Sequence, residues 1–416
     1  MDFGKIRVNY AAVGNDAPVQ SIRSVYNLNT SFAGTALASA QNTNPNANLV
    51  PELTKTFELG FENKFIKDRV GFDLTLYKTN TLNQIIAARV SSSTGTIYQY
   101  VNAGNIQNQG IELSLYASVL KSNDFEWMTR VNWALNRNEV IELDGDLTTY
   151  QLASVQGGIT IEAEVGQPYG VIKGTNYVYY NGDEDKPIVY DHPAGGVRYA
   201  KTSTTEQIGN MLPDWTGGWT NTFSYKNVSL SALIDVQKGG QFFSLDTWYG
   251  YGTGIYDFTS GTNDKGNPVR DNPEDGGGLP LGGVVAATDA NGDYIYDEET
   301  GNLTSDGTAN TEYGYYGNYS NASGWATAPN AMHVYDATYV KLRQMSLTYS
   351  LPKSIIEKWP IQGLDLSIIG RNLAILYKNS PYTDPEAGLS AGNVQGYQSG
   401  AYPAVREVGF NVTLKF

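Results

Sequence analysis

The segment Ile111-Glu-Leu-Ser-Leu-Tyr-Ala-Ser-Val119 alternates apolar and polar side chains without a break. A period of two places the apolar side chains on one face of a β-strand and the polar ones on the other. The chain ends on a second segment of this kind, Val408-Gly-Phe-Asn-Val-Thr-Leu-Lys-Phe416. Together they favour a sheet with one apolar and one polar face.

Ten segments carry this alternation. We expect each to form a strand of about 9 to 14 residues, the length that crosses a bilayer at a tilt. They are residues 5–10, 54–65, 70–77, 111–119, 125–136, 215–225, 228–237, 339–351, 364–373 and 408–416. Near Arg343 the apolar positions change phase, which predicts a β-bulge there.

The connections between these segments alternate between short and long. The short ones are residues 66–69, 121–124, 225–227 and 352–362, with a helical turn expected at 354–359. The long ones are residues 13–52, 81–107, 139–214, 240–336 and 374–404. Outer-membrane barrels have short periplasmic turns and long extracellular loops. The pattern therefore predicts an all-β fold, an antiparallel transmembrane β-barrel with long extracellular loops.

Composition excludes several classes of function. The 416 residues include no cysteine and two histidines, which rules out disulfides, thiolate metal sites and a His-rich metal centre. Residues 240–336 hold 14 acidic and two basic side chains, a field that repels phosphate and makes nucleic-acid binding improbable. No apolar run reaches the length of about 18 residues that a membrane-spanning helix needs.

Several motifs resemble one family of transporters. They are residues 48–52, 56–62, 101–104, 108–113, 208–215, 339–343 and 370–373, which include Asn-Leu-Val-Pro-Glu, Asn-Gln-Gly-Ile-Glu-Leu and Gly-Arg-Asn-Leu. From Asn44 onward the chain resembles the C-terminal barrel half of SusC/RagA-type TonB-dependent outer-membrane transporters.

The resemblance implies a barrel of about 22 strands that encloses a plug. Residues 1–416 are then expected to be its last ten strands or so, with the N-terminal plug and the earlier strands absent. It implies residence in the outer membrane of a Gram-negative bacterium, surrounded by outer-membrane lipid. Two protein partners follow from it: a SusD-like surface lipoprotein, and the TonB complex, contacted through a plug segment that is not in this chain.

The resemblance also implies nutrient import without enzymatic catalysis or a cofactor. Glycans, taken up as oligosaccharides, are the expected substrate, although related proteins also import peptides. The apolar face of the last strand, formed by Phe410, Val412, Leu414 and Phe416, is similar to the signal by which barrel proteins are recognised for insertion. It is equally what the last lipid-facing strand of a barrel requires.

The long loop at residues 240–336 is rich in aromatic side chains, whose flat faces suit stacking on sugar rings. The candidate ligand-binding residues are Trp248, Tyr249, Tyr251, Tyr256, Tyr315, Tyr316, Tyr319 and Trp325. The alternative is that these rings pack the loops against each other or lie in the interfacial aromatic girdle.

An acidic turn in the same loop spaces oxygen ligands as a calcium loop does. Asp289, Asn291, Asp293 and Asp297 occupy positions 1, 3, 5 and 9, but glycine falls at position 4 and Thr300 replaces the final glutamate. A calcium ion here and a solvated turn both remain open. The sequence Gly388-Leu-Ser-Ala-Gly392 matches a nucleophile elbow as text, yet no histidine follows it, so no catalytic residue is expected.

Two other classes of protein are weighed against a transporter. A secreted or surface β-rich carbohydrate-binding or adhesive protein would explain the aromatic residues and the acidity, but not the sorting of loops to one side. A glycoside hydrolase would need two carboxylates that converge on a cleft.

Overall fold

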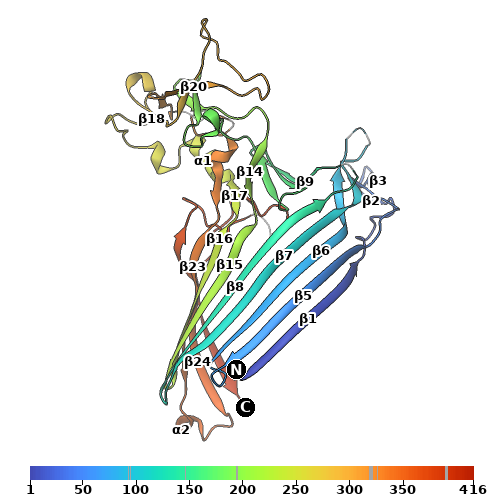
Figure 1. Ribbon diagram of the computed structural model, residues 1–416, viewed down its shortest axis with the longest axis vertical. Helices are drawn as coiled ribbons and strands as arrows, with labels where there is room; N and C mark the ends of the chain where they lie inside the picture. Colours follow the sequence, from blue (N-terminus) through green and yellow to red (C-terminus); the bar gives the residue numbers. More distant parts are fainter. Residues whose placement is uncertain are drawn as a thin grey trace.

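The structure is a computed structural model that describes residues 1–91, 93, 95–145, 147–193, 195–317, 322–325, 327–388 and 392–416, apart from the side chains of residues 89 and 103. Ten long strands form one antiparallel sheet in the order in which they occur along the chain (Figure 1). They are β1 (Phe3–Asn15), β5 (Glu52–Phe65), β6 (Val70–Arg89), β7 (Tyr98–Lys121), β8 (Phe125–Glu142), β15 (Pro213–Tyr225), β16 (Val228–Gly239), β23 (Tyr339–Ser350), β24 (Gly363–Lys378) and β26 (Glu407–Lys415). All ten predicted strands are confirmed.

The two faces of the sheet differ in chemistry, as the alternation predicts. One row across neighbouring strands joins Asp73, Ser114, Asn132, Gly218 and Asp235. The adjacent row, on the opposite face, is apolar and consists of Phe72, Leu115, Val131, Trp219 and Ile234. We call these the polar face and the apolar face.

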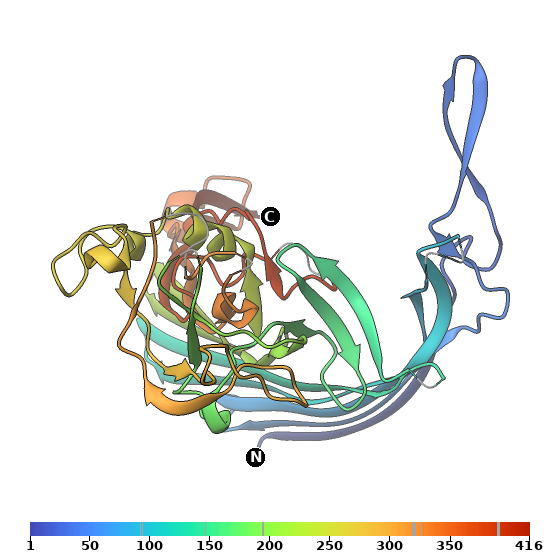
Figure 2. The same cartoon turned by 90° about the horizontal axis from the view of Figure 1, so that it is seen from above.

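The sheet is curved, and seen from above it forms an open wall (Figure 2). Within the described residues β1 pairs with β5 alone and β26 with β24 alone, so the two edge strands are not joined to each other. Phe410 on the apolar face of β26 is 81% exposed, and Phe416, which follows the strand, is 79% exposed.

The connections are sorted to opposite ends of the strands (Figure 1). The short turns, both chain termini and α2 (Lys353–Ile356) lie at one end, which we call the turn end. The folded loops lie at the other, the loop end. The helical turn that the sequence predicts at 354–359 is present, shifted toward the start of that connection.

One long connection is shorter than the sequence predicts. Residues 81–107 were expected to form a loop, but β6 and β7 continue through most of it, down to a pair between Arg89 and Tyr98. Asn83 and Gly104 both have positive φ, 56° and 53°, and lie opposite each other where the β6–β7 ladder skips one pair; the β7–β8 register shifts just beyond Gly104. These irregularities break the strict alternation from which strands are recognised in a sequence.

The predicted bulge near Arg343 is confirmed. Leu233 of β16 lies opposite Gln344, whereas the next residue, Ile234, lies opposite Leu342. Arg343 is therefore the extra residue of β23, which moves the apolar positions from Leu342 to Met345.

The long loops form small structures of their own at the loop end. One sheet contains β9 (Thr149–Val155), β10 (Ile159–Glu164), β11 (Val171–Gly174) and β14 (Glu206–Asn210); another contains β12 (Ile188–Asp191), β13 (Val197–Tyr199), β19 (Val284–Ala286) and β20 (Ser305–Ala309). Smaller pairings join β17 (Gln241–Ser244), β22 (Val334–Asp336) and β25 (Tyr397–Gln398); β18 (Leu279–Pro280) and β21 (Tyr313–Gly314); β2 (Tyr26–Phe32) and β3 (Thr35–Ala40); and β4 (Thr43–Asn44) with β7.

Helices are short and confined to connections. Besides α2 there are α1 (Leu245–Thr253) and the 3-10 turns η2 (Tyr180–Gly182), η3 (Asp257–Thr259), η4 (Pro273–Asp275) and η5 (Asn330–His333). In the described ranges no helix has both the length and the apolar character needed to cross a membrane. A buried cluster of Ile159, Ile161, Ile172, Phe243 and Tyr397 joins three separate loops into one core.

Candidate functional site

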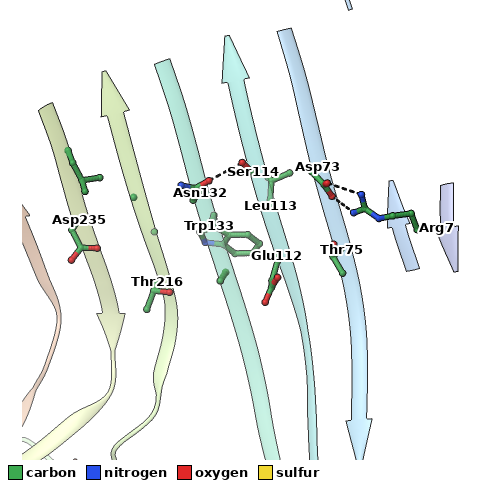
Figure 3. A pocket seen from close by; sticks show the side chains of 14 residues that line it. Arg7, Asp73, Thr75, Glu112, Leu113, Ser114, Asn132, Trp133, Thr216 and Asp235 are labelled. Carbon is green, nitrogen blue, oxygen red and sulfur yellow. Dashed lines mark hydrogen bonds and ion pairs between the residues drawn. The ribbon is translucent and has the colours of Figure 1, made fainter. Parts of the chain in front are cut away.

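The polar face of the sheet carries a cavity of about 760 Å³ (Figure 3). It extends across the strands from Arg7 of β1 to Asp235 of β16. Arg7 donates two hydrogen bonds to Asp73, with N···O distances of 3.0 and 2.5 Å, and this paired geometry fixes both side chains. The cavity therefore has a polar wall in which the charges of Arg7 and Asp73 are matched.

Amides and hydroxyls continue this wall toward the loop end. The Tyr77 hydroxyl donates to Asn136 at 3.0 Å, and Asn136 and Asn138 both donate to Asn108 at 3.0 and 2.9 Å. Uncharged groups that both donate and accept hydrogen bonds suit a polar solute of no fixed charge.

A group of buried and partly buried charges joins the loop after β24 to the sheet. The Lys341 ammonium lies 2.6 Å from Asp384 and also contacts Glu386, and the side chains of Lys341 and Asp384 are 4% and 5% exposed. Arg343, the bulge residue, bonds to Glu386 at 2.7 Å and to Asp235. We call these five residues the ion network.

The ion network borders a second cavity of about 580 Å³. Its lining combines Glu386 with amide, thioether and aromatic side chains from several segments: Met211, Gln237, Gln241, Phe242 and Gln395. The cavity thus lies where the strands meet the folded loops. Sequence reasoning missed this site, although the Tyr339-Val-Lys-Leu-Arg343 motif contains both of its cations.

Acid is expected to release the loop that contains Glu386. Burial opposes ionisation, but hydrogen bonds from Arg343 and Lys341 lower the pKa of Glu386 from 4.5 to about 2. Because the pKa of Glu386 is lower in the folded state, its ionised carboxylate stabilises the contact between its loop and β23. This stabilisation is complete above pH 4.5 and is lost as the pH falls from there toward 2. Hydrogen exchange of residues 379–388, corrected for its intrinsic pH dependence, should accelerate between pH 7 and pH 3.

The hairpin at residues 26–40 is the internal control for this measurement, because it contains no carboxylate side chain. Its corrected exchange rate should be the same at both pH values. Equal acceleration in the hairpin and in the loop would mean that acid loosens the protein as a whole, and would contradict a local role for Glu386.

Three of the predicted ligand-binding rings form one cluster. The ring centroids of Trp248 and Tyr249 are 4.8 Å apart, and Trp325 lies 6.0 and 5.0 Å from them. Each of these side chains is half-buried. The Tyr249 hydroxyl also accepts a hydrogen bond from Gln156, so this cluster connects two long loops.

Two more predicted rings lie in a second cluster around His333. Tyr251 contacts Tyr256 at 5.3 Å and His333 at 5.3 Å, and Tyr256 packs on Tyr382 at 4.1 Å. Burial raises the pKa of Tyr256 to about 12 and lowers that of His333 to about 3, so both are neutral at physiological pH.

The remaining predicted rings are placed differently. Tyr316 is buried against Phe258, and its hydroxyl pairs with Ser323 at 2.7 Å. Tyr315 is half-buried beside it, while Tyr319 lies outside the described residues. The contacts among the rings match the alternative in which they pack loops together. Ligand binding by these residues stays a prediction.

The acidic turn uses its carboxylates to hold its own backbone. Asp289 accepts hydrogen bonds from the amides of Asn291 and Asp293 at 2.8 and 2.9 Å, and Asp297 accepts from Thr300 at 2.7 Å. In the described part of the chain no three acidic or histidine side chains come together as a metal site would require. Calcium at this turn stays a prediction, and the central residues of the Gly388–Gly392 motif lie outside the described residues.

The chain is similar to proteins of known family. A model described as the outer membrane protein beta-barrel family matches residues 38–192. TonB-dependent receptor P26 of Formosa agariphila is 24% identical over 438 residues, which cover 98% of this chain and 40% of that protein. TonB-dependent receptor SusC of Bacteroides thetaiotaomicron is 29% identical over 101 residues, 24% of this chain and 10% of its own length.

Solved structures share the fold. The RagAB peptide importer in its closed-closed state aligns with 99% of this chain and 41% of its own, with a TM-score of 0.67 and 19% identity. The chain thus spans about 40% of the length of the first curated relatives and of this structural neighbour.

Proposed function

We propose that this chain forms the barrel wall of a nutrient importer. It is an outer-membrane β-barrel chain that resembles TonB-dependent receptors of the SusC/RagA type along nearly its whole length. The observation that carries the proposal is the sheet itself: ten antiparallel strands with a polar face, an apolar face and all folded loops at one end. Because outer-membrane barrels have short periplasmic turns and long extracellular loops, the loop end lies outside the cell and the turn end in the periplasm.

Oligosaccharides are the proposed substrates, taken up together with a SusD-like lipoprotein that covers the loop end. The amide- and hydroxyl-rich wall around Asn108 and Asn136 and the aromatic cluster of Trp248, Tyr249 and Trp325 are the features that favour a sugar. Peptides are the second candidate. The similarity to a structure named a peptide importer favours them.

Uptake by cells that produce the protein in its native outer membrane tests this function. Fluorescent oligosaccharides and peptides of equal size are supplied to these cells and to cells that lack the gene. We expect gene-dependent accumulation of the oligosaccharide, reduced by Trp325→Ala, since removing that ring opens the aromatic cluster. Phe223→Leu, an aromatic change on the apolar face at the turn end, is the matched control and should leave uptake unchanged.

Two outcomes bear on the proposal separately. Gene-dependent accumulation of the peptide alone would replace the sugar by the second candidate. Recovery of the protein in the soluble fraction, with the same gel mobility before and after boiling, would overturn the barrel wall itself.

A further inference from the structure

The apolar face carries a groove of about 320 Å³ near the turn end. Its walls are formed by Phe65, Phe72, Leu115 and Val131, and the rings of Phe65 and Phe72 stack at 6.4 Å. Its floor includes the smaller side chains of Ala117 and Thr129. A recess of this kind in a lipid-facing wall is filled by hydrocarbon, since water would find no polar partner there.

Aromatic side chains mark the depth of the groove in the bilayer. Trp127 stacks on Phe223 at 5.6 Å, and the Trp219 indole donates to Thr129, a groove residue, at 2.9 Å. Tyr225 and Tyr349, the last aromatic residues of β15 and β23 before the turn end, are 56% and 43% exposed. Tryptophan and tyrosine gather where the hydrocarbon meets the head groups, so the groove opens toward a head-group layer.

Two cations, Lys67 and Arg69, lie in the turn that joins the groove residues Phe65 and Val70. Arg69 immediately precedes the groove residue Val70, and its guanidinium donates to the carbonyls of Ser118 and Val119 at 3.1 and 3.2 Å. In the described structure its other N–H groups have no protein partner, and neither has the ammonium of Lys67. The two carbonyls fix the Arg69 guanidinium, and its remaining N–H groups can donate to a phosphate.

The acidic residue of this turn, Asp68, is already paired. Asp68 accepts from the Tyr116 hydroxyl and lies 3.6 Å from the Lys64 ammonium. Asp2 accepts from the backbone amide of Asp68 at 3.3 Å. The turn therefore presents Lys67 and Arg69 as unpaired positive charges, in a chain whose net charge is −14.

We propose that this groove and the two cations form a binding site for one anionic phospholipid of the leaflet at the turn end. One acyl chain fills the groove between Phe72 and Leu115, and the phosphate lies between Arg69 and Lys67. The site rests on the membrane orientation proposed above, which makes this leaflet the periplasmic one.

Lipid exchange on the intact protein tests the site. Protein extracted from its own membrane is equilibrated in micelles with equimolar phosphatidylglycerol and phosphatidylcholine, and bound lipid is identified by native mass spectrometry. We expect enrichment of phosphatidylglycerol, reduced about five-fold by either Lys67→Gln or Arg69→Gln. Lys226→Gln, at a neighbouring turn, is the matched control and should keep the enrichment. Ala117→Phe, which fills the groove, should lower the retention of both lipids.

Each outcome decides something. Unchanged enrichment in Lys67→Gln and Arg69→Gln, or unchanged retention in Ala117→Phe, overturns the site while the barrel remains. Retention of lipopolysaccharide that is lost in Lys67→Gln, Arg69→Gln and Ala117→Phe would place the turn end in the outer leaflet and overturn the proposed orientation as well. Heat-modifiable migration of every variant shows that its barrel is folded.

Discussion

Replacing Lys341 with methionine should destabilise the protein by about 3–5 kcal/mol, the usual effect of removing one partner from a buried ion pair. The change leaves Asp384, 5% exposed, without its cation, and Glu386 with Arg343 alone. The free energy of unfolding, obtained from urea titration of the protein in lipid vesicles, measures the effect. The loop after β24 should also exchange its amide hydrogens faster, since its contact with the wall is lost.

Lys415→Met is the matched control, because Lys415 pairs with Asp365 at 2.8 Å but is 60% exposed. Exposed pairs contribute about 1 kcal/mol or less. The double variant Lys341→Met with Asp384→Leu should recover part of the loss, since it removes an unpaired buried carboxylate. Equal effects of Lys341→Met and Lys415→Met would show that the ion network does not hold the loop.

Replacing Gly104 with alanine should cost about 3 kcal/mol or more, because two penalties act together. The φ of Gly104 is +53°, a conformation that L-residues adopt with strain, and a β-carbon there would lie 1.5 Å from the carbonyl oxygen of Glu142. The backbones of β7 and β8 must therefore move apart at this point. Unfolding free energy and hydrogen exchange at residues 103–106 and 140–142 would report it.

Gly145→Ala separates the two penalties. Gly145 has nearly the same φ, +59°, but a β-carbon there would meet no atom within 4 Å. Its substitution should cost about 1–2 kcal/mol, the strain of the left-handed conformation alone. If both glycine variants lose the same stability, the collision with Glu142 has no energetic effect.

Periodicity made the wall predictable, and irregularity limited the prediction. Strands such as residues 111–119 alternate strictly because each side chain faces either the apolar or the polar side. The extension of β6 through Ile85, Ile86 and Ala87 was missed, because these consecutive apolar residues do not alternate and they follow Asn83, where φ is positive and the ladder skips one pair. The bulge at Arg343 was predicted, since regular alternation is visible on both of its sides.

The candidate sites were less accessible from the sequence. Aromatic composition identified the rings of the long loop, but their grouping into two clusters depends on contacts between residues as far apart as Tyr251 and Tyr382. The ion network likewise joins Asp235 to Glu386 through a bulge. Pairings of this kind are set by how the loops fold over the sheet, and no local pattern encodes them.

The turn end also shapes how the wall can form. The hairpins β5–β6, β7–β8 and β15–β16 are closed by residues 66–69, 122–124 and 226–227, whereas the loops between hairpins, apart from residues 90–97, are far longer. Bringing two strands together costs less conformational entropy when the connecting segment is short, and contacts close in sequence form fastest. Each hairpin is therefore a kinetic unit. The wall would grow by adding strands in pairs, and the large loops would settle into their small cores after the strands on either side are in place.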